Sequence, residues 1–208
     1  MLDKSIPYRN IIMRLDAAAI KGLPRPVLPS GYALRAFQAG DEESWARIES
    51  AVLEFDAQAD ALAYFTREYL GFARELERRC VFVTAPDGRA VATATAWWGV
   101  NCASLSWVGV HPAHQSRGLG RAVVLEALSR YPSLEPGRDV YLHTQTWSHV
   151  AVGLYHSIGF YMLKTQSFSS QTAGGSVRVH HNDYDQAMSV LESVLSPEKI
   201  QSLRQAAR

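Results

Sequence analysis

The chain has 208 residues, of which 47% are hydrophobic and 20% are charged, and this composition is typical of a single soluble globular domain. Its formal net charge of +1 excludes a strongly basic nucleic-acid-binding surface, and no apolar run approaches the ~18 residues needed to span a bilayer. The two cysteines have no spacing typical of a disulfide framework or a zinc site. We therefore expect a cytoplasmic protein with no metal, no nucleic-acid partner and no membrane partner.

Residues 1–31 are predicted to be an N-terminal extended segment. Gly22 and the prolines that follow it interrupt the second half, and this density of helix breakers argues against a helix. A short strand is predicted at 32–37. A helix follows from Asp41, whose side chain can cap it, and a second helix is predicted around 61–72.

The next part of the chain changes from helical to strand periodicity. Residues 80–84 and 90–98 have the pattern of two strands, and the Asp-Gly pair between them is typical of a hairpin turn. The elements expected after this hairpin are a strand at 103–110, a helix at 119–131 stopped by Pro132, a strand at 140–147, a helix at 150–158 capped by Gly159, and a strand at 160–168.

This order of elements predicts an α/β fold with a mixed, partly antiparallel central sheet flanked by helices. The strand–helix–strand unit from 103 to 147 should be parallel and right-handed. Residues 169–208 are predicted to form a C-terminal loop and helical tail, with a loop at 169–176 and two amphipathic helices after it. This tail can dock on the core or form a contact between two copies of the chain.

A polar loop with two glycines joins the strand at 103–110 to the following helix. Gly118 and Gly120 carry no side chain, so a phosphate can approach the backbone N–H groups and the positive end of the helix dipole. Arg117 and Arg121 add positive charge beside them. This pattern predicts a pyrophosphate site, although a strand-to-helix turn without a ligand would show the same glycines. The sequence lacks the further residues that P-loop and dinucleotide-binding folds require.

The loop resembles the Gln/Arg-x-x-Gly-x-Gly/Ala signature of the GNAT superfamily of N-acyltransferases, which binds the pyrophosphate of coenzyme A, in the segment Gln115-Ser116-Arg117-Gly118-Leu119-Gly120. Residues 108–112 resemble the end of the fourth strand of that family. Residues 154–160 resemble its Leu-Tyr-x-x-x-Gly-Phe element. The resemblance covers 32–168, which we therefore expect to be the GNAT acyltransferase domain.

The resemblance implies a splayed sheet that holds acetyl-CoA, the co-substrate, between its fourth and fifth strands. A bulge in the fourth strand would free backbone groups of Val108, Gly109 and Val110 to bond the pantetheine arm and to stabilise the oxyanion formed during transfer. Arg121 would assist the glycine loop with the pyrophosphate. Tyr155 matches the family's general acid near the sulfur; it also lies in an apolar helical stripe, from which a packed ring can present its hydroxyl to a cleft.

The resemblance leaves the general base open. Many members of the family place a glutamate on the fourth strand, but residues 103–110 contain no carboxylate, and Ser104 or a neighbour takes its place. We name His111 as a candidate because a histidine has a suitable unperturbed pKa of roughly 6.5. The alternatives are His143, Glu54, Asp56 and a chain of water molecules.

Further residues are candidates for binding. The family commonly has an asparagine that contacts the cofactor at the start of the next helix; Ser148 stands in that region, where it can cap the helix and contact the cofactor. Glu54 and Asp56 suit a cationic amine, although a solvated acidic helix end is the alternative. Trp98 is one of several aromatic residues that can line an acceptor pocket.

We therefore expect an acetyl-CoA-dependent N-acyltransferase that transfers an acetyl group to a primary amine of a small molecule or peptide by direct attack on the thioester. Two alternatives stay open. One is a GNAT module that binds acyl-CoA without catalysis, as a sensor or partner protein, which the missing carboxylate favours. The other is a nucleotide-binding protein that uses the same loop. A homodimer would also fit, because dimers are frequent in the family.

Overall fold

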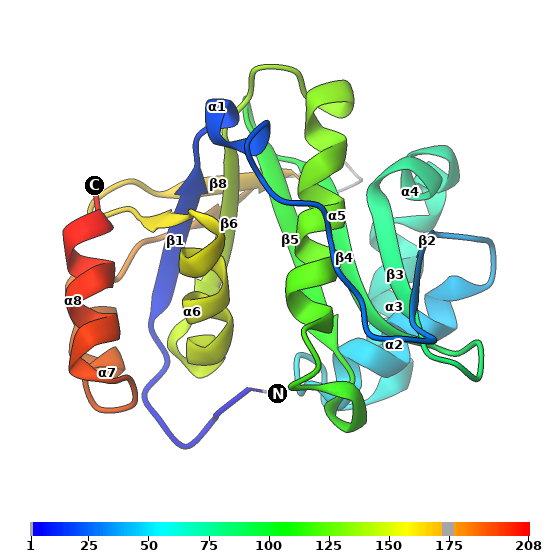
Figure 1. Ribbon diagram of the computed structural model, residues 1–208, viewed down its shortest axis with the longest axis horizontal. Coiled ribbons are helices and arrows are strands. Elements are labelled where there is room, and N and C mark those ends of the chain that lie inside the picture. The colour runs from blue at the N-terminus through cyan, green and yellow to red at the C-terminus, as the bar shows by residue number, and fades with distance from the viewer. Residues whose placement is uncertain (1, 172–176) are drawn as a thin grey trace.

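The computed structural model describes residues 2–171 and 177–208, and its centre is a mixed β-sheet (Figure 1). The strands are β1 (Asn10–Leu15), β2 (Ala33–Ala36), β3 (Cys80–Thr84), β4 (Ala90–Trp98), β5 (Ala103–Val110), β6 (Val140–Gln145), β7 (Tyr161–Met162), β8 (Phe168–Gln171) and β9 (Val177–His180). Seven of them form the sheet in the order β2-β3-β4-β5-β6-β1-β7, and β8 and β9 form a separate hairpin. This confirms the predicted mixed, partly antiparallel α/β fold.

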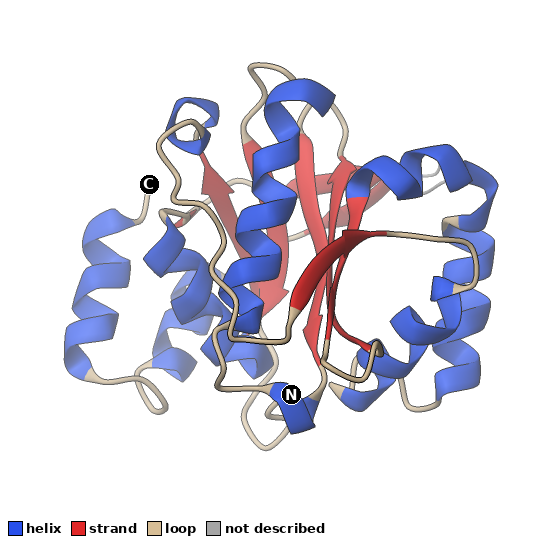
Figure 2. Cartoon of the chain, turned by 45° about the vertical axis from the view of Figure 1, so that its right-hand side comes forward, coloured by secondary structure: helices blue, strands red, loops and turns tan. Residues whose placement is uncertain are grey.

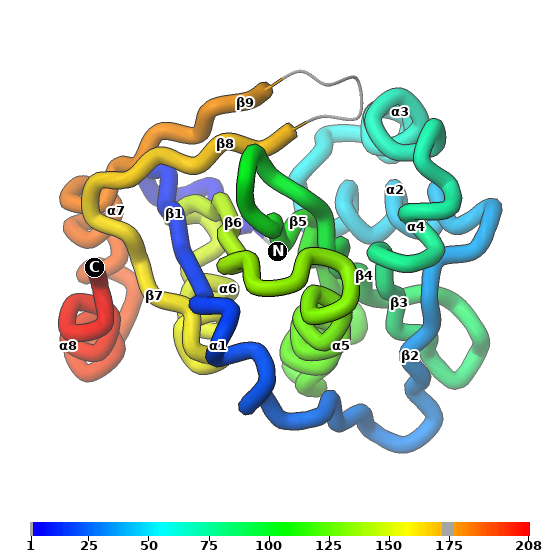
Figure 3. The backbone as a smooth tube through the Cα atoms, turned by 90° about the horizontal axis from the view of Figure 1, so that it is seen from above, coloured from blue at the N-terminus to red at the C-terminus, as the bar shows by residue number. Residues whose placement is uncertain are grey.

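Helices cover both faces of the sheet (Figures 2 and 3). They are α1 (Ala17–Ile20), α2 (Asp41–Ala51), α3 (Gln58–Glu68), α4 (Ala73–Arg79), α5 (Leu119–Leu134), α6 (His149–Ile158), α7 (Tyr184–Leu191) and α8 (Pro197–Ala206), with 3-10 turns at Leu70–Phe72, Pro112–His114 and Thr146–Ser148. The helices α5 and α6 lie on one face, whereas α2, α3, α4 and the β8–β9 hairpin lie on the other.

Alternation along the strands buries side chains on both faces. In β1, Ile11 and Met13 pack into the core under α5 and α6, and Ile12 between them packs on the opposite side with Phe168. The face under α2 and α3 has its own core, which is rich in aromatic side chains and centres on Trp45. The functional cavity described below lies between this aromatic core and the β8–β9 hairpin.

The sheet is splayed between β5 and β6. These strands pair in parallel, as predicted, but only Ala103–Val140 and Ser104–Tyr141 are in register. Beyond this point the two strands diverge, and Figure 1 shows them close at one end and apart at the other. The N-terminus of α5 lies at the open end. Unpaired backbone groups of both strands therefore face the space between them.

The N-terminal residues are part of the sheet, which corrects the assignment of 1–31 to a separate extended segment. The strand β1 pairs antiparallel with β6 over six residues and also with β7. The apolar run of β1, Ile11-Ile12-Met13, was not recognised as a strand, because the prolines and glycines of residues 22–31 suggested an extended segment. Because β1 supplies buried residues on both faces, the domain cannot begin at residue 32.

Four further expectations are corrected. The strand expected at 160–168 is divided into β7 and the start of β8, and β8 continues into the expected loop, of which residues 172–176 lie outside the described residues. The helix α5 passes through Pro132 and ends at Leu134, since a proline in the last turn still permits two more residues. The helix α4 was not expected. Gly40, with a φ of 98°, stands at the N-cap of α2 in place of Asp41, whose carboxylate binds Arg35 instead.

The C-terminal tail docks on the core. Arg208 donates its backbone N–H to Met162 in β7 at 3.0 Å, and Lys164 donates back to Arg208 at 2.8 Å. The helices α7 and α8 bury Met188, Leu191 and Leu203 in the core that contains β1. The C-terminal tail therefore packs on the core of its own chain, which is the first of the two alternatives given above.

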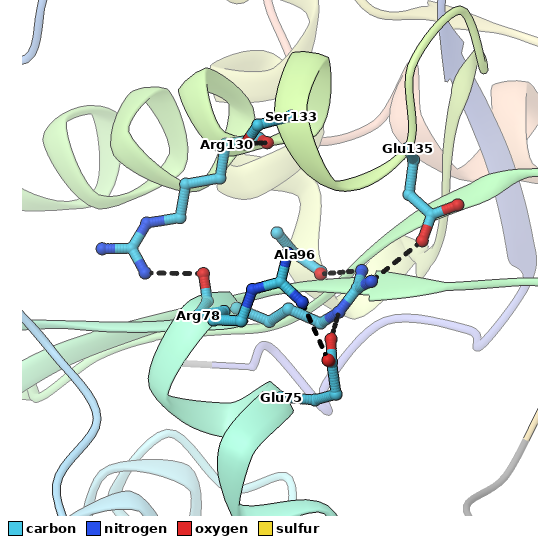
Figure 4. Close-up of polar contacts among 7 residues, drawn as sticks. Glu75, Arg78, Ala96, Arg130, Ser133 and Glu135 are labelled. Atoms are coloured by element: carbon cyan, nitrogen blue, oxygen red, sulfur yellow. Dashed lines mark hydrogen bonds and ion pairs between the residues drawn. The ribbon is translucent and has the colours of Figure 1, made fainter.

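A buried arginine joins α4 to the sheet and to the end of α5, and Figure 4 labels three of the residues that it contacts, Glu75, Ala96 and Glu135. The guanidinium of Arg79 donates to Glu75 at 2.6 Å, to Glu135 at 3.0 Å and to the carbonyl of Ala96 at 3.2 Å. It also lies over the ring of Trp98, 4.6 Å from its centroid. This network positions a tryptophan that lines the functional cavity.

Candidate active site

A cavity of about 360 Å³ opens where β5 and β6 diverge. Its floor comes from β5 and β6, one wall from α2, α3 and the end of β4, and the opposite wall from the β8–β9 hairpin, with α6 below the gap. The predicted site residues that line it are Glu54, Trp98, Val108, His143, Ser148 and Tyr155. The fold thus brings residues from distant parts of the sequence to one place.

A β-bulge interrupts β5 at the cavity. Thr95 of β4 pairs with Ser106 and Thr93 pairs with Gly109, so one residue of β4 faces both Trp107 and Val108. Trp107 has a φ of 54°, which is rare for a residue with a large side chain. The bulge therefore takes backbone groups near Val108 out of the ladder with β4, and their role in binding the cofactor stays a prediction.

The glycine loop leaves the N-terminus of α5 uncovered. Gly118 stands at the N-cap with a φ of 78°, and a Cβ built there would have nothing within 4 Å. Gln115 donates its side-chain amide to the carbonyl of Val110 at 2.9 Å, which ties the loop to the end of β5. Gly120 is more closely packed, since a Cβ built on it would lie 3.4 Å from Leu154 of α6. The first N–H groups of a helix have no partner within it, so this end can bind an anion.

The charged and capping residues near the loop differ in position. Arg117 is exposed, and Arg121 donates to Ser157 of α6 at 3.0 Å. Ser148 occupies the N-cap of α6 and lines the cavity, but within the described part of the chain its side chain makes no capping hydrogen bond. The expected capping role of Ser148 is therefore wrong, and its hydroxyl is free to face the cavity.

A buried carboxyl group that the sequence analysis missed lies beside the bulge. Glu49 of α2 is 1% exposed and lines the cavity, and its Oε1 has no hydrogen-bond partner among the described residues. A Cβ built on Gly109 would lie 2.7 Å from this oxygen, so the carboxyl group occupies the space that a side chain on β5 would fill. Burial raises the pKa of Glu49 well above its usual value, and Glu54 raises it further.

Glu54 lies at the same wall as Glu49, and these two residues are called the carboxyl pair below. Oε1 of Glu54 accepts a hydrogen bond from Gln145 of β6 at 3.4 Å. Burial raises the pKa of Glu54, while the bond from Gln145 and the charge of Lys4 act in the opposite direction.

One signal in the sequence could have identified Glu49: it stands four residues after Trp45 and next to Ile48, on the apolar face of α2.

Tyr155 approaches the carboxyl pair from α6. Its ring is 6% exposed and packs against Phe160, while the residue lines the cavity. Burial raises the pKa of Tyr155, and the charges of Glu49 and Glu54 raise it further. The hydroxyl therefore keeps its proton at neutral pH and can donate it to a group in the gap.

Three of the predicted acid–base candidates lie elsewhere or are poorly suited. His111 does not line the cavity; its ring lies 6.1 Å from that of His114, and its pKa is lowered by burial and by Arg47. Asp56 is fully solvated and faces Lys4 at 3.8 Å. His143 does line the cavity, but burial lowers its pKa to about 3, which makes it a weak base.

Aromatic side chains make up much of the remaining wall. Trp98 stacks on Trp97 with ring centroids 4.2 Å apart. Trp107, projecting from the bulge, donates its indole N–H to the hydroxyl of Tyr69 at 2.7 Å and packs edge-on against Tyr64. These rings supply flat apolar surface beside the carboxyl pair, as expected for Trp98.

Comparison with known proteins agrees with this architecture. Residues 42–160 match the model of the GNAT acetyltransferase family. The chain therefore belongs to the GNAT acetyltransferase family, which confirms the resemblance found in the glycine loop and the Leu-Tyr-x-x-x-Gly-Phe element.

Two curated relatives are informative. The mycothiol acetyltransferase of Actinosynnema mirum is 31% identical over 154 residues, which cover 72% of this chain and 50% of that protein. The N-alpha-acetyltransferase RimI of Mycobacterium tuberculosis is 42% identical over 53 residues, which cover 26% of this chain and 31% of that protein. The chain thus spans about half the length or less of these relatives.

Solved structures share the fold. A GCN5-related N-acetyltransferase from Sphaerobacter thermophilus superimposes with a TM-score of 0.59 and 23% identity, over 75% of this chain and 49% of that chain. A tandem GNAT protein from the clavulanic acid biosynthesis pathway superimposes with a TM-score of 0.52 and 21% identity, over 76% of this chain and 51% of that chain. At this level of identity the likeness concerns the fold alone.

Two features of the described residues bear on the remaining expectations. None of the helices in this part of the chain is long and apolar enough to cross a membrane. Across 2–171 and 177–208, no group of three or more histidine, cysteine, aspartate or glutamate side chains is arranged to hold a metal ion.

Proposed function

We propose that the chain is an N-acetyltransferase of the cytoplasm that uses acetyl-CoA and a primary amine of a small molecule or peptide. The observation that carries the proposal is the meeting of a proton donor and two proton acceptors at the splayed part of the sheet. Tyr155 comes from α6 on one face, and Glu49 and Glu54 come from α2 and the residues after it on the other. Direct transfer from a thioester to an amine requires this pair of functions.

The residues around the gap fit acetyl-CoA. The uncovered N-terminus of α5 and the empty space in front of Gly118 suit the pyrophosphate, with Arg117 and Arg121 nearby. The bulge at Trp107 and Val108 supplies backbone groups for the pantetheine arm and for the carbonyl oxygen of the acyl group. When bound, acetyl-CoA supplies the acetyl group as a thioester, so no metal is required.

Glu49 is the general base in this proposal. An alkyl amine has a pKa near ~10 and reaches the site as ammonium, so it must lose a proton before its nitrogen can form a bond to carbon. Glu49 is the carboxyl group beside the bulge, and it takes the place of the strand-four glutamate that this chain lacks. Burial, and then the charge of Glu54, raise the pKa of Glu49 well above its usual value, which makes it a stronger base than a solvated carboxylate.

Tyr155 is the general acid. The carbon–sulfur bond breaks as the nitrogen–carbon bond forms, and the thiolate that leaves has a pKa of about 8.5, so a proton from the tyrosine hydroxyl assists its departure. The hydroxyl carries its proton at neutral pH, because burial and the carboxyl pair raise the pKa of Tyr155. The proton returns to Tyr155 from solvent after the products leave.

Binding and turnover test the proposal in sequence. At about 100 times the dissociation constant, a ligand that binds only the folded state stabilises it by about 2.7 kcal/mol, so acetyl-CoA and coenzyme A should raise the melting temperature while ATP and NAD should not. Free thiol should then appear when acetyl-CoA is mixed with a panel of amines. A thermal shift without thiol release for any amine would contradict the enzymatic proposal and favour a module that only binds acyl-CoA. No shift at all would contradict the cofactor site.

A further inference from the structure

The β8–β9 hairpin forms a fixed wall of the cavity. Val100 donates its N–H to the carbonyl of Ser169 at 3.0 Å, which joins β8 to the end of the β4–β5 connection. The ring of Phe168 stacks on Tyr141 of β6 at 5.9 Å between centroids, and the ring of His180 stacks on His143 of β6 at 4.1 Å. The side chains that this hairpin turns toward the cavity therefore have defined positions.

The alternation along β9 places a cation at the open side of the cavity. Arg178 and His180 line the cavity, whereas Val177 and Val179 do not and are 56% and 51% exposed. Arg178 is exposed as well, so its guanidinium is accessible to a molecule that enters the cavity. The hairpin thus presents a guanidinium to the acceptor side of the site.

The cavity consequently has walls of opposite charge. Glu49 and Glu54 lie on one side, where Lys4 also lines the cavity near Glu54, and Arg178 lies on the hairpin opposite. The ion pairs formed by the described residues include none for Arg178. Its charge does reach the cavity: burial lowers the pKa of His180 to about 4, and Arg178 lowers it further. His180 is therefore neutral at pH 7, and Arg178 is the cation of this wall.

We propose that Arg178 anchors an anionic group of the acceptor, so that the preferred acceptors are amines that carry a carboxylate or a phosphate. The inference rests on the proposed function and names the substrate class of the same site. The ammonium group of such a molecule would face Glu49 and Glu54, its anionic group would face Arg178, and the ring of Trp98 would cover the part between them. A guanidinium suits this task because its fork of N–H donors matches a carboxylate or a phosphate.

Matched pairs of acceptors test the proposal. The pairs are 6-aminohexanoate and hexylamine, tyrosine and tyramine, and phosphoethanolamine and ethanolamine, each assayed by thiol release from acetyl-CoA. At least one anionic member should have a kcat/KM about tenfold or more above that of its partner, as expected for a hydrogen bond to a charged group. The pair that shows the difference tells a carboxylate from a phosphate.

Variants show whether Arg178 causes the preference. Arg178→Gln should remove the advantage of the anionic acceptor in kcat/KM. The kcat/KM of the neutral partner should stay within about twofold of its value in the unchanged protein, and the KM for acetyl-CoA should not change. Arg178→Lys should restore part of the advantage. Arg89→Gln removes an equal charge from an exposed turn and serves as the control. If the neutral amines are equal or better acceptors, or if Arg178→Gln affects both members alike, the anion subsite is wrong while the proposed function stands. If no amine releases thiol, the proposed function itself fails.

Discussion

The carboxyl group of Glu49 lies against Gly109, in the space where every other amino acid would carry a side chain. A Cβ on Gly109 would be 2.7 Å from Oε1 of Glu49 and 2.9 Å from Ile48. The glycine in β5 and the glutamate in α2 are therefore complementary. A carboxyl group reaches the floor of the cavity from the helix above the sheet, although the strand itself carries none.

The first prediction concerns the proton acceptor. Glu49→Gln should lower kcat by about a hundredfold and remove the acidic limb of the kcat–pH profile, because the amide cannot accept the proton. In the unchanged protein this limb should lie above the ordinary carboxyl pKa of 4.5, since burial raises the pKa of Glu49. Steady-state kinetics between pH 4.5 and 9 would measure both effects. Asp56→Asn removes a solvated carboxylate outside the cavity and should change neither.

The same substitution has a consequence for stability. The pKa of Glu49 is higher in the folded than in the unfolded chain, so its contribution to stability is fully present below the unfolded value and is lost as the pH rises through the folded value. Glu49→Gln remains neutral and should therefore be more stable than the unchanged protein on the alkaline side of this range. Chemical unfolding of both proteins at pH 4.5 and pH 8.5 would measure this difference in the free energy of unfolding. The same difference at both pH values would contradict a buried Glu49 that titrates in this range.

The second prediction concerns the proton donor. Tyr155→Phe keeps the ring that packs on Phe160 and removes the hydroxyl, so kcat should fall about a hundredfold while the dissociation constant of coenzyme A changes less than about twofold. Rapid-quench or steady-state kinetics with calorimetric binding would separate the two. An unchanged kcat would show that another group or water protonates the sulfur.

The third prediction compares two glycines that have the same backbone conformation. Gly118 and Gly137 have φ values of 78° and 74°, and a Cβ on either would meet nothing within 4 Å. Aspartate at either position costs about 1–2 kcal/mol of backbone strain. Gly118→Asp also places a negative charge at the N-terminus of α5 and should weaken binding of coenzyme A more than about tenfold, whereas Gly137→Asp should bind normally. Calorimetric titration of both variants tests the loop, and equal affinities would refute it.

The fourth prediction concerns the buried arginine Arg79, whose partners Glu75 and Glu135 are labelled in Figure 4. Arg79→Met should reduce the free energy of unfolding by about 3 kcal/mol, because it removes the nearer ion-pair partner of the largely buried carboxylate of Glu135 and leaves only Arg138, at 3.7 Å. Arg78→Met removes an exposed arginine one residue earlier and should cost less than about 1 kcal/mol. Urea unfolding gives both values. Similar losses for the two variants would show that the network around Trp98 adds little stability.

Local patterns in the sequence determined the elements that depend on neighbouring residues. The Asp-Gly turn marked the β3–β4 hairpin, and the two glycines after β5 marked the uncovered end of α5, because turns and helix ends are governed by backbone preferences within a few residues. Tyr155 was named from the resemblance of residues 154–160 to the family's Leu-Tyr-x-x-x-Gly-Phe element. The family and the splayed sheet followed from this resemblance and from that of the glycine loop.

Tertiary structure alone decided which distant residues share the site. The place of β1 inside the sheet depends on its pairing with β6, more than a hundred residues later in the chain, and the neighbouring prolines say nothing about it. Glu49 appeared to be one acidic residue among several in α2 until the fold turned it onto Gly109. Its burial and the position of Arg178 at the cavity depend on which faces of a helix and a hairpin meet the sheet. Packing between distant segments determines these faces, and no local pattern encodes them.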